Sequence, residues 1–212
     1  IFADLKDKIK NCKELAYQRV DVCDELSIQR ALLDYKESGK TVSGIINLAY
    51  PRNSLYGSKV NEVSYESYTE NVSKNLGAYF IIMKIFSEEL IETGGCVINL
   101  SSIYGSFTPR FDIYEGTNMT APVEYVGIKS AIEATTRYFA KLYKKHGVRL
   151  NCIAPGGVFD NQDSNFVTAY NEHAGAKGML EGNEVAECVE WLILKGQCVT
   201  GQTITIDDGF TL

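Results

Sequence analysis

The sequence predicts an α/β protein, built as a doubly wound parallel sheet with helices on both faces. Short apolar segments alternate along the chain with longer segments of helical periodicity. Several of the short segments are apolar throughout, as expected for strands that are covered on both sides. This alternation favours strand–helix–strand units and therefore a parallel sheet.

Each expected element follows from its local composition. The strand segments are short and rich in Val and Ile, and two of the helical segments end at glycine, Gly39 and the Gly94–Gly95 pair. The expected elements are a short strand near Val20, a helix over 27–39, a buried strand over 42–49, a long helix over 64–92, a strand over 96–102, a helix over 125–145, a strand from 147 that runs into a Gly/Pro turn, a helix over 184–195 and a last strand over 202–209.

The whole-chain composition excludes several classes of protein. The 212 residues carry a formal net charge of -6, which gives no basic surface for a nucleic acid. No apolar run reaches the roughly 20 residues of a membrane span, and we expect no secretory signal. Six scattered cysteines without a CxxC spacing indicate reduced thiols of a cytoplasmic protein, with neither disulfides nor a metal site. We expect one domain over residues 1–212.

Polar and glycine-rich residues follow the expected strands. In a parallel sheet, ligands bind at the carboxyl ends of the strands. The residues at these ends are Asp4, Asp21, Asn47–Tyr50, Ser101–Ser102 and Pro155–Gly157. The sequence therefore predicts a ligand cleft at this edge.

Tyr125 and Lys129 lie four residues apart at the start of an expected helix, so both side chains share one face. A nearby ammonium favours the phenolate and lowers the pKa of a tyrosine from its usual value of about 10. The pair could then act as an acid or base near neutral pH. Taken alone, the same spacing also fits an exposed helix pair, because chance gives about one Tyr-x-x-x-Lys in a chain of this composition.

The surrounding segments resemble the short-chain dehydrogenase/reductase family. "NLSSIYG" resembles the strand that carries the catalytic serine, and "YVGIKSA" matches the Tyr-x-x-x-Lys helix. "SKNLGAYF" resembles the helix of the structural asparagine, "VRLNCIAPGGV" the turn beside the nicotinamide, and "VTGQTITIDDG" the last strand. In "INLAYP", Asn47 and Ala49 match the family's Asn-Asn-Ala-Gly, while Leu48 and Tyr50 depart from it. The matches follow the family order and cover most of the chain.

This resemblance implies a Rossmann-like fold and a nicotinamide cofactor, NAD, with NADP left open. It assigns a substrate-holding role to Ser102, with Ser101 as the alternative, and proton transfer to Tyr125. Lys129 would tune Tyr125 and hold the nicotinamide ribose, and Asn75 would fix a water in a proton relay. The implied cofactor-binding residues are Asp4, Asp21, Val22, Asn47, Ala49, Tyr125, Lys129, Pro155, Gly156 and Val158.

The N-terminus departs from the family pattern. The family begins with a strand and the turn Thr-Gly-x-x-x-Gly-x-Gly, which holds the cofactor pyrophosphate. This sequence opens at "IFADL", which resembles the end of the second strand, so that Asp4 would bind the adenosine ribose and Asp21–Val22 would flank the adenine. Alternatively, Asp4 is a solvated loop acid. We expect about 30 residues of the natural protein, one strand, turn and helix, to precede Ile1; a truncated, non-catalytic relative is the alternative.

The segment between Ser102 and Tyr125 is longer than the short members of the family usually have. It should form a loop over the strand ends, where a substrate would lie. A gap of this length also occurs in the extended branch of the family, which acts on sugar nucleotides. Within the short branch, "YPRN", "IYEGTNMTAPVEYVGIKSAI" and "NCIAPGGVFDNQ" resemble the flagellin modification protein A group, whose members act in making surface-glycan sugars. Arg52, Arg110 and Glu115 are then candidate substrate contacts, or simply scattered surface charges.

The sequence therefore predicts an NAD(P)-dependent oxidoreductase acting on a hydroxyl or carbonyl carbon of a sugar derivative. An epimerase or dehydratase of sugar nucleotides with transiently used NAD is the nearest alternative, and a non-enzymatic interaction protein is another. The resemblance also implies a homodimer or homotetramer that packs through the helices over 64–92 and 124–145.

Overall fold

The computed structural model describes residues 17–212. The chain divides into two compact units, with the boundary between Thr41 and Val42. The described part of the first unit holds helix α2 (Glu25–Glu37), where the Asp24 side chain caps the N-terminus by accepting from the Leu26 amide at 3.0 Å. Gly39 follows this helix with a φ of +79°, which confirms it as the stop.

The expected strand near Val20 is wrong. Residues 17–20 have no regular structure, and the chain turns at Val22–Cys23 before α2. Within the described residues no strand pairs with this segment, so its apolar character alone does not make it a strand.

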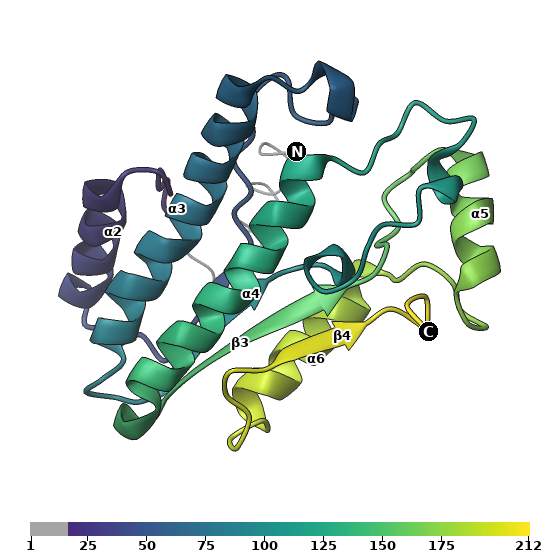
Figure 1. Ribbon diagram of the computed structural model, residues 1–212. Coiled ribbons are helices and arrows are strands. Elements are labelled where there is room, and N and C mark those ends of the chain that lie inside the picture. Colours follow the sequence, from purple (N-terminus) through teal and green to yellow (C-terminus); the bar gives the residue numbers. More distant parts are fainter. Residues whose placement is uncertain (1–16) are drawn as a thin grey trace. The chain divides into compact units, whose positions relative to one another are not determined.

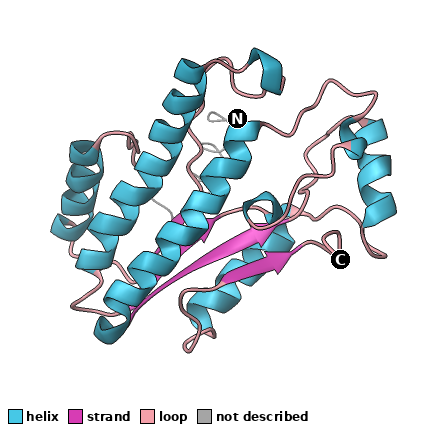
Figure 2. Cartoon of the chain, in the orientation of Figure 1, coloured by secondary structure: helices cyan, strands magenta, loops and turns pink. Residues whose placement is uncertain are grey.

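The second unit is built on a parallel sheet of four strands in the order β1-β2-β3-β4. The strands are magenta in Figure 2. The strands are β1 (Gly44–Asn47), β2 (Gly95–Leu100), β3 (Val148–Pro155) and β4 (Thr203–Ile206). The register places Asn47 beside Asn99, Asn99 beside Cys152, and Cys152 beside Thr203. The carboxyl ends of all four strands therefore lie at one edge, as the sequence predicts.

Helices cover both faces of this sheet (Figure 1). The long helices α3 (Tyr65–Glu89) and α4 (Val123–Tyr143) pack together on one face, and α6 (Gly182–Leu194) lies on the other. The helix α5 (Ser164–His173), which the sequence analysis missed, lies beyond the carboxyl ends of the strands. The remaining short turns are 3-10 helices: η1 (Val60–Glu62), η2 (Ile103–Gly105), η3 (Asp112–Tyr114) and η4 (Lys144–His146).

The two faces of β2 show why both helical layers are needed. Cys96, Ile98 and Leu100 pack against α6, where Val189 and Leu192 complete a buried cluster. Asn99 points to the other face and donates to Thr136 Oγ1 of α4 at 2.9 Å. Burying each large aliphatic side chain stabilises the fold by about 1.5–3 kcal/mol. Helix α6 therefore keeps the apolar side chains of β2 out of water, and α4 supplies the hydrogen-bond acceptor for Asn99 on the other face.

Buried Arg149 on β3 joins the sheet to the end of α6. Its Nη1 donates to the carbonyls of Leu192 and Gly196 at 3.0 and 2.9 Å. These carbonyls lie at the C-terminal end of α6, where helix carbonyls lack intrahelical partners and a positive charge is favourable. Among residues 17–212, none of the helices combines the length and the apolar character that a membrane crossing requires.

Candidate active site

A cavity of about 410 Å³ opens at the carboxyl ends of β2 and β3. Its wall combines the segment after β2, the start of α4, the turn after β3 and one side of α5. The lining includes Ser102, Tyr104, Tyr114, Tyr125, Gly156 and Tyr170. Thr120, Ala121 and Pro122 also line it, so the long segment before Tyr125 borders the site as the sequence predicts. None of the described residues that line the cavity is charged.

The two adjacent serines have different surroundings in the structure. Ser102 lines the cavity, and its Oγ accepts a hydrogen bond from the Tyr104 amide at 3.2 Å, which caps η2. Ser101 instead donates to Glu133 Oε1 at 2.7 Å, inside the contact between the β2 end and α4. Of the two candidates, Ser102 therefore faces a potential substrate.

Tyr125 and Lys129 lie on the first turns of α4, as the four-residue spacing predicts. The Tyr125 side chain lines the cavity together with that of Ser102. Lys129 Nζ lies beneath it, 5.5 Å from the centre of the Tyr125 ring. Ser102 and Tyr125 therefore line one corner of the cavity, and Lys129 lies beneath Tyr125 outside the lining.

Lys129 is a buried cation held by aromatic rings. Its Nζ donates to the Leu100 carbonyl at 2.6 Å, and it lies 5.0 Å from the Tyr50 ring centre and 5.5 Å from that of Tyr79. Burial lowers the pKa of Lys129 to about 8, because the charged form loses its hydration. Contacts with ring faces partly offset this loss.

The pKa of Tyr125 is raised, whereas the sequence analysis predicted that it would be lowered. Burial raises it, and the hydrogen bond with Ser102 only partly opposes this change. We expected Lys129 to lower it, but the ammonium is directed at the Leu100 carbonyl and lies below the ring. Tyr125 is therefore a neutral phenol in this structure and carries a proton that it can donate.

Two buried asparagines carry side-chain oxygens without a partner. Asn75 on α3 donates through Nδ2 to the carbonyls of Pro51 and Asn71, but its Oδ1 is unpaired. Asn47, at the end of β1, donates to Asn99 and likewise leaves Oδ1 unpaired. A buried acceptor without a partner is costly, so both oxygens fit a site completed by water or by a hydroxylated ligand.

These donors and acceptors fit the nicotinamide ribose of a dinucleotide. Lys129 has three N–H donors, of which one reaches Leu100, and the ribose offers hydroxyl groups as partners. Ala49 follows Asn47 in the half-buried loop after β1.

The turn after β3 forms the opposite wall of the cavity. The Gly156 amide donates to Ile206 O at 2.9 Å, and the Gly157 amide donates to the Tyr170 hydroxyl at 2.8 Å. A Cβ at Gly156 would lie 2.5 Å from the Tyr170 oxygen, so no larger residue fits here. Pro155 and Val158, on either side, also line the cavity.

The loop after β1 contains site residues that the sequence analysis did not assign. Tyr50, which stands where the family has glycine, places its ring edge-on to that of Tyr125, with 5.6 Å between the ring centres. Its hydroxyl lies 3.0 Å from that of Tyr56, which lines the cavity. The departure from the family pattern at Tyr50 was the signal that could have identified this pair.

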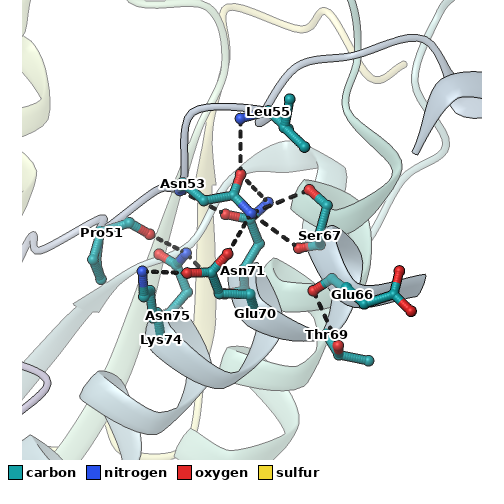
Figure 3. Close-up of polar contacts among 10 residues, drawn as sticks. All are labelled: Pro51, Asn53, Leu55, Glu66, Ser67, Thr69, Glu70, Asn71, Lys74 and Asn75. Carbon is teal, nitrogen blue, oxygen red and sulfur yellow. Dashed lines mark hydrogen bonds and ion pairs between the residues drawn. The ribbon is translucent and has the colours of Figure 1, made fainter. Parts of the chain in front are cut away.

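Asn53 anchors that loop to α3 (Figure 3). Its Nδ2 donates to Ser67 Oγ at 3.1 Å and Glu70 Oε2 at 2.9 Å, and its Oδ1 accepts from the Leu55 amide at 3.1 Å. The Asn53 amide in turn donates to Asn71 Oδ1 at 3.0 Å. These bonds fix the loop that carries Tyr50 and Tyr56.

The other candidates lie away from the cavity lining. Arg52 is exposed and stacks on the Tyr56 ring at 5.5 Å, Arg110 stacks on Phe210 at 5.7 Å, and Glu115 is exposed. Asp21 and Val22 precede α2 in the first unit, where Asp21 Oδ1 accepts from the Cys23 amide at 2.9 Å. Asp4 lies outside the described residues.

Comparison with known proteins agrees with this geometry. The family described as enoyl-(acyl carrier protein) reductase matches residues 2–211. Among curated relatives, the post-translational flagellin modification protein A of Campylobacter coli is 33% identical, over 98% of this chain and 83% of its own length. A 2,5-dichloro-2,5-cyclohexadiene-1,4-diol dehydrogenase of Sphingobium indicum is 29% identical, over 92% of this chain and 78% of its own.

A solved structure extends the likeness to three dimensions. The short-chain dehydrogenase of Leptospira borgpetersenii serovar Hardjo-bovis with bound NAD+ superposes with a TM-score of 0.81 at 28% identity, over 94% of this chain and 79% of that chain. The fold, the ordered motifs and these relatives lead to one conclusion: the chain belongs to the short-chain dehydrogenase/reductase family of oxidoreductases.

Proposed function

We propose that this oxidoreductase uses NAD(P) to interconvert a hydroxyl and a carbonyl on a sugar derivative, in the biosynthesis of a surface glycan such as that of modified flagellin. The observation that carries the proposal is that Ser102 and Tyr125 line the same cavity, with Lys129 beneath Tyr125.

Each residue has a role that follows from its surroundings. Tyr125 is the neutral phenol at the cavity and gives its proton to the substrate oxygen in reduction, leaving the phenolate; in oxidation the phenolate form takes the proton of the substrate hydroxyl. Ser102 holds the same oxygen. Lys129 supplies N–H donors for the nicotinamide ribose, because only one of its three reaches Leu100. When bound, the nicotinamide supplies or accepts the hydride.

Asn47, Asn75 and the turn after β3 complete this assignment. The unpaired oxygen of Asn75 is the acceptor for a water that connects Lys129 to solvent, and Asn47 and Ala49 border the cofactor. Pro155, Gly156 and Val158 support the nicotinamide from the opposite wall. Asp21 and Val22 are assigned to the adenine end.

The sugar substrate is supported by two observations. One is the similarity to the flagellin modification protein A of Campylobacter coli. The other is the cavity wall, in which tyrosines provide both flat apolar faces and hydroxyl groups. A sugar ring presents the same combination of apolar C–H and polar O–H groups.

We also propose that the protein is a cytoplasmic homo-oligomer. Cys96, Cys152, Cys188 and Cys198 are free thiols, as a reducing compartment favours. Phe80 of α3 and Leu142 of α4 are large apolar residues that are 46% and 53% exposed on the second unit, and burial between two copies would remove them from water.

The test combines turnover and cofactor binding in the full-length protein. Absorbance at 340 nm follows NADH or NADPH with a panel of sugars and sugar nucleotides, and calorimetry measures NAD and NADP affinity. We expect Tyr125→Phe to reduce kcat by about 100-fold or more, the scale of a lost general acid, while its NAD affinity stays within about threefold. Tyr65→Phe, an exposed tyrosine at the start of α3, is the control.

Three results would contradict the proposal. Unchanged turnover in Tyr125→Phe would exclude the assigned acid. Product formation without net NADH or NADPH change would indicate the epimerase or dehydratase alternative. Failure of the full-length protein to bind either dinucleotide would indicate a non-catalytic relative.

A further inference from the structure

The cavity wall is unusually rich in phenol groups. Tyr56, Tyr104, Tyr114, Tyr125 and Tyr170 all line it, and no charged side chain of the described residues does. Tyr125 is assigned to proton transfer. The other four hydroxyls raise the question of what they bind.

Tyr104 and Tyr114 form a hydroxyl pair. Their oxygens are 3.2 Å apart, and both side chains line the cavity. Two phenols carry two hydrogens, and the bond between them uses one of these. Whichever tyrosine donates, the other keeps a hydrogen that no described side chain accepts.

Tyr50 and Tyr56 form a second pair, 3.0 Å apart, of which only Tyr56 lines the cavity. Burial raises the pKa of both hydroxyls; the bond between them raises that of Tyr50 further and opposes the rise at Tyr56. The Tyr50 hydroxyl donates to that of Tyr56, so Tyr56 keeps its own hydrogen. Arg52 over the Tyr56 ring and the Asn53 anchor hold this pair in place.

Tyr170 provides a third hydroxyl. Its oxygen accepts from the Gly157 amide at 2.8 Å, and its ring is stacked on Phe210 with 4.1 Å between the ring centres. The amide fixes the position of the oxygen while leaving its own hydrogen unused. Each of the three phenols is thus oriented by a bond that it accepts.

We infer that these three hydroxyl donors, from Tyr56, from the Tyr104–Tyr114 pair and from Tyr170, recognise the oxygens of an uncharged polyhydroxylated ring. This inference rests on the proposed function and narrows its substrate class. A carboxylate or phosphate inside the cavity would be desolvated without a cation among the lining residues, which is costly. A ring that lacks the oxygens would leave the phenols unpaired, and sites of that kind reject such analogues strongly.

Any charged group of the natural substrate, such as a nucleotide diphosphate, therefore lies outside the cavity. Arg52, which is exposed, lies over the ring of Tyr56 with 5.5 Å between its Cζ and the ring centre, and can contact such a group. The ring that enters the cavity is neutral.

The test is a binding measurement that needs no turnover. Saturation-transfer NMR, with and without NAD, measures the affinity of the full-length protein for methyl glycosides of glucose, galactose and mannose, and for glucuronate and cyclohexanol as charged and apolar rings. At least one glycoside should bind more tightly than both comparison rings. Tyr56→Phe and Tyr104→Phe should each weaken that binding by about 3- to 10-fold, the value of one neutral hydrogen bond, and leave cyclohexanol binding unchanged.

Tyr65→Phe serves as the control, because this tyrosine is 78% exposed on α3, and circular dichroism checks the fold of each variant. The inference is overturned if glucuronate binds as well as the glycosides, if no glycoside binds, or if both cavity variants bind like the wild type. Glycoside binding without any nicotinamide turnover would instead refute the proposed function and leave this inference standing.

Discussion

Lys129 should make the stability of the protein depend on pH in the alkaline range. Its side chain is buried, and its pKa falls from 10.5 to about 8 on folding. Below pH 8 the ammonium is charged in both states, and the folded state bears the full cost of burying it. Between pH 8 and 10.5 the unfolded chain binds a proton that the folded chain does not, so the free energy of unfolding rises with pH.

The size of this change follows from the shift in pKa. A shift of about 2.5 units corresponds to about 3 kcal/mol, at 1.36 kcal/mol for each unit. Lys129→Met removes the titrating group and keeps a long apolar chain. The stability of the variant relative to the wild type should therefore fall by about 3 kcal/mol between pH 8 and 10.5. The hydrogen bond to Leu100 is lost at every pH and does not alter this slope.

Urea unfolding followed by circular dichroism, at half-unit steps from pH 7 to 10.5, measures this difference. Lys141→Met, at an exposed position on the same helix, is the matched control and should show no such slope. If the unfolding free energy of Lys129→Met relative to the wild type stays constant with pH, or rises, the burial of a titrating ammonium at this position is refuted.

Three further substitutions test the framework around the site. Glu133→Ala should reduce the unfolding free energy by about 2–3 kcal/mol, because buried Ser101 and exposed Ser106 each lose the carboxylate oxygen to which they donate. Glu187→Ala, at an exposed position on α6, is the control. Equal urea midpoints for Glu133→Ala and the wild type would count against this role. Gly105→Ala places a Cβ against the Glu133 carboxyl and should cost about 1–3 kcal/mol by thermal melting, whereas a wild-type melting temperature would show that the segment adapts. Asn53→Ala removes the hydrogen bonds to Ser67, Glu70 and Leu55. We expect the unfolding free energy to fall by about 2 kcal/mol and KM to rise. An unchanged KM would show that the loop does not shape the substrate site.

Local patterns were enough to predict most of the fold. The short runs rich in Ile, Val and Leu around Ile45, Val97 and Leu150 predict strands, and the structure has them as β1, β2 and β3. The four-residue spacing of Tyr125 and Lys129 fixes their common helix face whatever surrounds them. The strand expected near Val20 is absent because an apolar residue does not supply a pairing partner. Helix α5 was missed because no element was assigned between the turn after residue 155 and the helix over 184–195.

The sequence by itself determined the α/β class, the order of the strands and helices, and the residue types that meet at the strand ends, because these depend on periodicity and on motif order. Only the tertiary structure decided which serine faces the cavity, that Tyr50 covers Lys129, that Tyr125 is a neutral phenol and that the cavity wall carries no charge. The burial and the ring contacts of a side chain are made by residues far apart in the chain, so a local sequence pattern cannot predict them.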